Sequence, residues 1–189
     1  MRQGATKNSD NWFFSALLGD FVFILSQNTF HYNAGYWSDY NEYNLVGGET
    51  GFDSQETKLP TYWKTSFSKI CLGMKIGQQI NFIIVNKQAD SLYSLIADGQ
   101  YRATFLGRDT WEKLIGSQAS LQPNCNKEGF NADCFYNCGS KARIGLLGNN
   151  ENDCDSVDSR IGFGTGGAPA DDNSCGNQDI KAMGYILVQ

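Results

Sequence analysis

The chain has 189 residues, of which 41% are apolar and 13% aromatic, and a net charge of −5 at neutral pH. Aromatic and aliphatic content this high excludes an intrinsically disordered chain, and the lack of the required repeats excludes collagen and coiled coil. No basic stretch offsets the 20 acidic residues. The sequence therefore predicts no nucleic-acid partner, because binding to a phosphate backbone needs clustered Lys and Arg.

The first 50 residues contain one apolar run and one aromatic segment. Residues 20–26 contain a continuous apolar run, Phe21 to Leu25, which is typical of a central strand. Residues 30–44 are aromatic and polar at once, with no steady period. Such a segment is more often a loop whose rings cover a core, and the alternative is a platform on which a ligand stacks. The sequence leaves open which of these roles Tyr36, Trp37, Tyr40 and Tyr43 have.

The middle of the chain predicts a hairpin and two short helices. The hairpin turns at Gly77 and continues into a strand over residues 80–85. One helix is expected over residues 90–96, where a capping residue precedes apolar positions at helical spacing. The second is expected over residues 109–115, with Asp109 as N-cap and Glu112 completing a capping box.

The last third is expected to consist of two strands and two long loops. Residues 143–148 and 180–188 are largely apolar and predict strands, the second docked in a sheet. Residues 124–138 and 149–177 are rich in polar residues and Gly, which favours loops. With 21 Gly and 17 Asn, the composition favours a loop-rich β or α+β domain. We expect one domain over residues 20–189, preceded by an N-terminal segment, 1–19.

The cysteine content indicates whether the protein resides in a reducing or an oxidising cellular compartment. Six Cys accompany a single His, and no C-x₂-C pair is present, so a disulfide framework is favoured over a zinc site. The apolar run 12–18 resembles the core of a signal peptide but is not followed by an A-x-A cleavage site. The alternative is that the sequence is a fragment of a longer exported protein whose export signal lies elsewhere. No stretch reaches the roughly 18 apolar residues of a membrane span. The prediction that the protein is secreted therefore depends mainly on its cysteine content.

The strongest local signal is an acidic loop, which we define as residues 149–158. It holds four carboxylates and three amides within ten residues. Because Ca²⁺ takes about 6–8 oxygen ligands, a loop of this kind can wrap the ion. The EF-hand spacing is absent, and a solvated acidic loop is the alternative. The candidate metal ligands are Asn150, Glu151, Asp153, Asp155 and Asp158.

A glycine-rich run follows the acidic loop. Gly162, Gly164 and Gly167 match G-x-G-x-x-G, but the next residues predict a turn instead of the helix that dinucleotide binding needs. Glycine at this density indicates backbone that closely approaches a ligand, a metal or a neighbouring strand. An enzyme is not expected, because His31 is the only His and no G-x-S-x-G is present. Paired carboxylates for glycoside hydrolysis stay open.

Six short segments carry a resemblance to a known family: 70–74, 91–99, 125–131, 143–152, 158–164 and 181–186. Together they resemble extracellular proteins of corals and sea anemones that have fibrinogen C-terminal-like domains. The resemblance covers roughly residues 20–189. The order of an Asn-Asn-Glu segment, a Cys, a Gly-rich run and another Cys is more distantly similar to intelectins and fibrinogen-related lectins.

The resemblance implies a secreted α+β domain with a twisted, mainly antiparallel sheet, short helices and long calcium-holding loops. In intelectins bound Ca²⁺ coordinates vicinal hydroxyls of a glycan, and in many fibrinogen-related lectins it supports a nearby ligand pocket. By local order, Asn150 falls in the intelectin asparagine segment, and Asp171 or Asp172 near its acidic residue. Asp153 and Asp155 are similar to the paired aspartates of the fibrinogen-type calcium loop. The intelectin His and aromatic cage are missing here.

A disulfide hypothesis completes the sequence-based expectations. Cys154 and Cys175 bracket the Gly-rich run, and pairing them closes a loop of about 20 residues, worth roughly 3 kcal/mol in the chain-entropy model. Cys134 and Cys138 then close a short loop, which leaves Cys71 to pair with Cys125.

The function expected from the sequence is an extracellular, calcium-supported domain that recognises glycans or glycoproteins. The ligand surface is expected at the acidic loop together with Gly162, Gly164, Gly167, Asp171 and Asp172. The alternative is a structural or matrix protein in which calcium only stabilises loops. Whether the chain forms homo-oligomers is left open.

Overall fold

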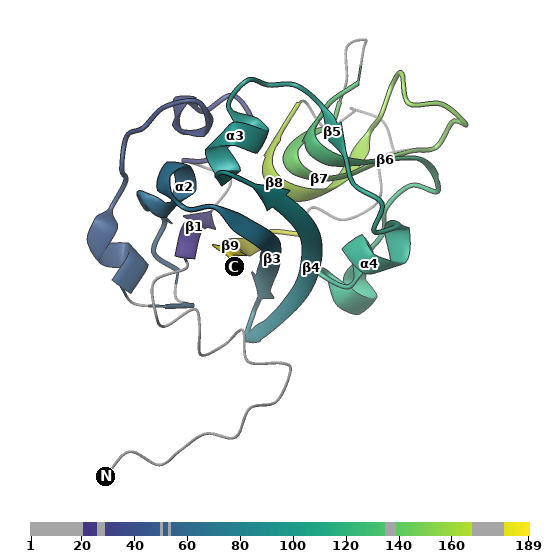
Figure 1. The fold of residues 1–189 in the computed structure, drawn as a ribbon. Helices are drawn as coiled ribbons and strands as arrows, with labels where there is room; N and C mark the ends of the chain where they lie inside the picture. Colours follow the sequence, from purple (N-terminus) through teal and green to yellow (C-terminus); the bar gives the residue numbers. More distant parts are fainter. Residues whose placement is uncertain (1–20, 26–28, 50, 53, 135–138, 168–179) are drawn as a thin grey trace.

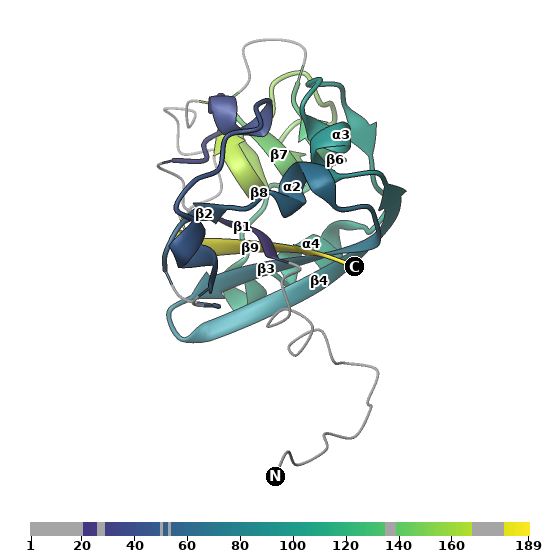
Figure 2. The same ribbon diagram turned by 60° about the vertical axis from the view of Figure 1, so that its left-hand side comes forward.

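The computed structural model describes residues 21–25, 29–49, 51–52, 54–134, 139–167 and 180–189. These form two antiparallel sheets, with strand orders β2-β1-β9-β3-β4 and β5-β6-β7-β8 (Figures 1 and 2). The strands are β1 (Phe21–Leu25), β2 (Thr57–Lys58), β3 (Phe67–Ile76), β4 (Gln79–Ala89), β5 (Arg102–Ala103), β6 (Asn124–Ala132), β7 (Lys141–Asn149), β8 (Ser159–Gly166) and β9 (Met183–Val188). The helical segments are η2 (Gly35–Trp37), η3 (Leu45–Glu49), α2 (Thr61–Lys64), α3 (Leu92–Ile96), α4 (Arg108–Glu112) and η4 (Gly116–Gln118).

The prediction of an α+β domain with antiparallel pairing and short helices is confirmed, although there are two sheets instead of one. The segment 1–19 lies outside the described residues. Among the helices that the structure describes, none has the length and apolar character needed to cross a membrane.

The structure confirms four elements that were predicted from local patterns in the sequence. β1 lies between β2 and β9 in the interior of the first sheet. β3 and β4 form the hairpin, with Gly77 in the turn at a φ of +60°, a conformation that glycine adopts without strain. At α3, the Ser91 hydroxyl accepts a hydrogen bond from the Ser94 amide and the Ser94 hydroxyl accepts one from the Ser91 amide. β9 docks between β1 and β3, as expected for residues 180–188.

The inner faces of both sheets and the helices share one hydrophobic core. β3 contributes Ile70, Leu72 and Met74, and alternate residues of β9 and β7 face the same interior. Trp111 of α4 and Leu92 of α3 are completely buried there. In the ribbon view, α4 and α3 lie at opposite ends of the space between the two sheets (Figure 1). A smaller cluster, Cys71, Tyr185 and Leu187, covers the outer face of the first sheet.

The aromatic segment 30–44 covers one end of this core. Phe30 and Trp37 have no exposed surface, and the Trp37 indole donates a hydrogen bond to the His31 carbonyl oxygen. Tyr36 and Tyr43 pack against the core from its edge. Tyr40 differs from them, because 60% of its surface is exposed. The segment is therefore mostly core, with one ring left at the surface.

Three sequence-based expectations are wrong. The segment 124–138 contains strand β6, and the segment 149–177 contains strand β8, although both were expected to be loops. Asp109 is not the N-cap of α4, because the helix begins at Arg108 after Gly107, and Glu112 is its last residue. The strands escaped prediction because their sequences are polar or Gly-rich, and both depend on pairing with the apolar strand β7 that lies between them.

A row of glycines crosses the second sheet and allows its strands to approach closely. Gly129 of β6 pairs with Gly145 of β7, which pairs with Gly162 of β8. A Cβ on Gly145 would lie 2.8 Å from the Ala142 Cβ and 2.9 Å from the Gly162 Cα, and closer still to the Ile161 carbonyl oxygen. Any side chain at this position would force the strands apart.

Replacing Gly145 with alanine is expected to lower the free energy of unfolding by about 1–3 kcal/mol, the usual cost of overpacking. The matched control is Gly35→Ala, where the nearest atom, Asp39 Oδ2, lies 3.9 Å from the added Cβ. Urea unfolding of both variants measures the effect. Equal stability of the two variants would show that the row of glycines is not required by packing.

Candidate functional site

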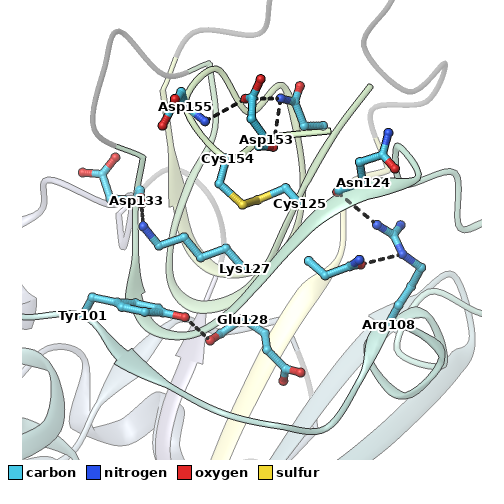
Figure 3. The surroundings of a disulfide bond; sticks show 12 residues. Tyr101, Arg108, Asn124, Cys125, Lys127, Glu128, Asp133, Asp153, Cys154 and Asp155 are labelled. Carbon is cyan, nitrogen blue, oxygen red and sulfur yellow. Dashed lines mark hydrogen bonds between the residues drawn. A yellow bond between two sulfur atoms is a disulfide. The ribbon is translucent and has the colours of Figure 1, made fainter. Parts of the chain in front are cut away.

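The acidic loop leaves the end of β7 and returns at the start of β8. Its base is a small apolar cluster formed by Ala132, Ala142, Leu147 and Val157, against which Cys125 and Cys134 pack. Figure 3 shows the Cys125–Cys154 disulfide between this sheet and the carboxylates of Asp153 and Asp155. The loop therefore rests on a buried patch and is tied to it covalently.

The disulfide joins Cys125 of β6 to Cys154 of the loop, across 29 residues of sequence. The predicted pairs Cys154–Cys175 and Cys71–Cys125 are wrong. Cys71 is a free, buried thiol on β3 in the other sheet, and burial raises its pKa to about 12. The physical reason is register: Cys125 lies opposite Gly148, one residue before the chain enters the loop, so Cys154 is its near neighbour.

Cys134 is disulfide-bonded as well. The partner that the sequence predicts for it, Cys138, lies outside the described residues, as does Cys175. The Cys134–Cys138 pair therefore stays a prediction.

The start of β6 is irregular, and α4 holds it in place. Cys125 and Asn126 both have left-handed backbone, with φ of +71° and +56°, where β6 inserts an extra residue opposite β7. Arg108 Nε donates to the Asn126 side-chain oxygen at 2.8 Å, and Arg108 Nη2 donates to the Asn124 carbonyl oxygen at 3.3 Å. These contacts, visible in part in Figure 3, set the direction in which Cys125 faces the loop.

Hydrogen bonds centred on Asp153 order the loop itself. The Asn149 amide nitrogen donates to Asp153 Oδ1 at 3.1 Å and to the Asp153 carbonyl oxygen at 3.2 Å. The Asp155 backbone N–H donates to the same Oδ1 at 2.9 Å. From the sheet side, Asn124 donates to the Asn150 carbonyl oxygen at 2.8 Å. The loop is thus held at both its first residue and its centre.

One polar atom at the base of the loop is unsatisfied. Asn149 has no exposed surface, and its Oδ1 has no hydrogen-bond partner among the residues that the structure describes. A buried acceptor without a partner costs about 1–3 kcal/mol, so native proteins rarely keep one. Its amide group already faces two oxygens of Asp153. Amide, carboxylate and carbonyl oxygens are the ligands that calcium prefers, so Asn149 and Asp153 offer suitable atoms. Because the Asn149 nitrogen is the atom that faces Asp153, the side-chain amide would have to turn over for its Oδ1 to share an ion with the Asp153 oxygens.

The predicted metal ligands do not gather around one point. Asn150, Glu151, Asp153 and Asp155 are exposed, and Asp158 is half-buried. Asn150 donates to Glu151 Oε1 at 3.0 Å, a bond between neighbours at the surface. Within the described ranges, no group of three or more His, Cys, Asp or Glu side chains is placed to hold a metal ion.

The predicted ligand-binding glycines lie on or next to β8. Gly162 faces the backbone of β7, and a Cβ on Gly164 would meet the Arg143 side chain at 2.8 Å. Gly167 follows the strand directly. The close approach expected at these glycines is therefore to neighbouring strands and side chains. Asp171 and Asp172 lie outside the described residues, so a ligand surface at this end of the loop stays a prediction.

A cationic side chain balances the acidic loop from the sheet. Lys127 of β6 lies beside the disulfide and donates to the Asp133 carbonyl oxygen (Figure 3). Burial lowers the pKa of Lys127, and the nearby carboxylates of Asp133 and Asp155 oppose this shift. The Lys127 ammonium also lies 4.8 Å from the centre of the Tyr101 ring.

Sequence reasoning found the loop but missed Asn149, Asn124 and Lys127. Asn149 ends an apolar strand, and an amide at the last position of a buried strand is the one signal that could have singled it out. Asn124 and Lys127 carry no such signal, because their role depends on the pairing of β6 with β7.

Comparison with known proteins adds no relative. No family model, no curated protein and no solved structure matches this chain.

Proposed function

We propose that this chain is a secreted binding domain that recognises glycans or glycoproteins with the help of Ca²⁺ held at the acidic loop. We also propose that the domain has the fibrinogen C-terminal-like fold that the resemblance implies. Asn149 and Asp153 would hold the ion, with the nearby carboxylates Glu151, Asp155 and Asp158 adding negative charge. A bound cation would offset the repulsion among these groups and order the surface that meets the ligand.

The observation that carries the proposal is the buried Oδ1 of Asn149, which has no hydrogen-bond partner among the described residues, on an amide whose nitrogen contacts Asp153. Two further features support it. The disulfide is typical of exported domains, where oxidising conditions preserve it. The tie between Cys125 and Cys154 also reduces the entropy that the loop would lose on binding an ion.

Calcium is expected to raise the melting temperature of the wild-type protein relative to EDTA. At one hundred times the dissociation constant, mass action predicts about 2.7 kcal/mol of added stability. Asp153→Ala/Asp155→Ala should lose this shift. The control Asp90→Ala/Asp109→Ala removes two exposed carboxylates outside the loop and should keep it. Thermal unfolding with each cation and chelator measures the effect, and identical wild-type curves in calcium and EDTA would contradict the calcium site.

A glycan array probed in calcium and in EDTA separates the two functions. Binding that EDTA abolishes supports the recognition domain. A calcium shift without binding to any glycan supports the alternative, a matrix protein in which the ion only stiffens the loop. The hydrogen bonds around Asp153 favour this alternative, because they already give the loop a structural role.

A further inference from the structure

A second surface feature stands apart from the acidic loop and centres on Tyr40. This ring is 60% exposed, yet it is not isolated. It stacks on Tyr93 of α3, with 4.5 Å between ring centres and 25° between planes, and Trp63 of α2 meets it edge-on at 5.9 Å. A hydrogen bond with Tyr40 raises the pKa of Tyr93. α2 and α3 lie next to each other in both ribbon views (Figures 1 and 2).

The residues on either side of Tyr40 are fixed by a buried cation. Lys58 has no exposed surface, and its ammonium donates to the Asp39 carbonyl oxygen at 2.8 Å and to Asp39 Oδ1 at 2.6 Å. The Asp39 carboxylate in turn accepts from the Asn41 backbone N–H at 3.0 Å and from its side-chain amide at 2.9 Å. Tyr40 therefore lies between two clamped neighbours, with its own ring braced by Tyr93.

Lys58 is enclosed by aromatic rings. Its ammonium lies 5.1–5.7 Å from the ring centres of Tyr62, Trp63 and Tyr36. Burial lowers the pKa of Lys58, whereas the hydrogen bond and charge of Asp39 oppose the shift. Burying a cation is costly unless it is paired, and here the pairing holds a surface segment in one conformation.

A rigid, exposed tyrosine is the kind of group that anchors a ligand. It offers a large amphipathic surface and loses little conformational entropy on binding, especially when its ring is already fixed. The two charges that fix this segment, Lys58 and Asp39, are already paired with each other, so the exposed ring is the feature that a ligand meets there. The C–H groups on the flat face of a sugar ring carry partial positive charge and suit the negative face of an aromatic ring.

We propose that Tyr40, with Asp39 and Asn41 beside it, forms a stacking site for a neutral sugar ring. The carboxylate and amide would accept from and donate to its hydroxyl groups. This inference shares the glycan ligand of the proposed function, but none of its residues belongs to the acidic loop. It therefore predicts saccharide binding that persists when calcium is removed.

The test is affinity electrophoresis of the whole chain in native gels that contain neutral polysaccharides: mannan, a β-glucan and a galactan. The variants are Tyr40→Ala, which removes the ring, and Tyr40→Phe, which keeps it. Phe105→Ala is the matched control, because it deletes another ring, 93% exposed, that lies between β5 and α4. Each protein is run in calcium and in EDTA, together with gels that contain heparin or a proline-rich peptide.

At least one neutral polysaccharide should retard the wild type, in EDTA as well as in calcium. Tyr40→Ala should weaken this binding at least tenfold, whereas Tyr40→Phe and Phe105→Ala should stay within about threefold of the wild type. The proposal is overturned if no neutral polysaccharide retards the wild type, if Tyr40→Ala binds as the wild type does, or if only heparin or the peptide is bound. Binding lost in EDTA but unaffected by Tyr40→Ala would leave the calcium proposal standing and reject this one.

Discussion

Replacing Glu128 with alanine is expected to lower the free energy of unfolding by about 3–5 kcal/mol, because several donors would each lose a hydrogen bond to a charged acceptor. The Glu128 side chain is 9% exposed, and four donors converge on its carboxylate. They are the Thr104 hydroxyl at 2.7 Å, the Trp111 indole at 2.8 Å, and the backbone N–H groups of Leu106 and Gly107 at 2.9 and 2.8 Å. Alanine would leave all four unsatisfied.

The isosteric variant Glu128→Gln separates charge from shape. It keeps one acceptor but turns an N–H toward groups that donate, so a smaller loss of about 1–3 kcal/mol is expected. Glu112→Ala is the matched control. That carboxylate, on the neighbouring α4, is partly exposed, and its ion pair among the described residues is a 3.7 Å contact with Arg108. Its loss should cost about 0–1 kcal/mol. A similar small loss for Glu128→Ala would contradict the role of this carboxylate.

The same network makes stability depend on pH. Burial alone would raise the pKa of Glu128, but the hydrogen bonds from Trp111, Thr104 and the two amides outweigh it, and the pKa lies below its ordinary value of 4.5. The stabilisation is therefore present above the unfolded-state pKa and is lost as pH falls through that value toward the folded-state pKa. Urea unfolding between pH 7 and pH 3 should show this loss in the wild type and a flatter profile in Glu128→Gln.

Removing the Cys125–Cys154 disulfide is expected to cost about 3.5 kcal/mol, from the chain entropy released when a loop of about 29 residues is no longer closed. The change is Cys125→Ala/Cys154→Ala, measured by urea unfolding without reductant. The control is Cys71→Ala, which alters a buried thiol that closes no loop and leaves only a small cavity. A loss in the double variant no larger than in the control would show that the bridge does not hold the acidic loop in the native fold.

The disulfide also bears on the calcium proposal. If Asn149 and Asp153 are held in place by the bridge, the double variant should bind calcium more weakly than the wild type, because ordering the loop would then oppose binding. Calorimetric titration with calcium measures this difference separately from stability. Equal affinities would show that the hydrogen bonds around Asp153 order the loop without the bridge.

The predictable parts of the fold are those with local signals. The β3–β4 hairpin follows from Gly77 and the apolar residues beside it, and α3 follows from Ser91 with apolar positions behind it. β9 was evident as an apolar run. In each case the residues that determine the element lie within it or next to it.

The parts that escaped prediction depend on distant residues. Gly107 and Leu106, at the start of α4, donate their N–H groups to Glu128, some 20 residues later in the chain, so the local capping pattern at Asp109 and Glu112 does not mark the start of the helix. β6 and β8 are strands because β7 lies between them. The acidic loop was found from composition, but its bridge to Cys125 depends on strand register, which spacing along the sequence does not reveal.

The position of β9 has a consequence for synthesis in the cell. β9 fills the middle of the first sheet, between β1 and β3, although it lies more than 100 residues after both of them in the sequence. Until residues 183–188 leave the ribosome, both neighbours have backbone edges without partners, and such edges favour aggregation. Pairings that join distant parts of the sequence also form slowly. Chaperones are therefore expected to be needed most in the interval between the synthesis of β3 and that of β9.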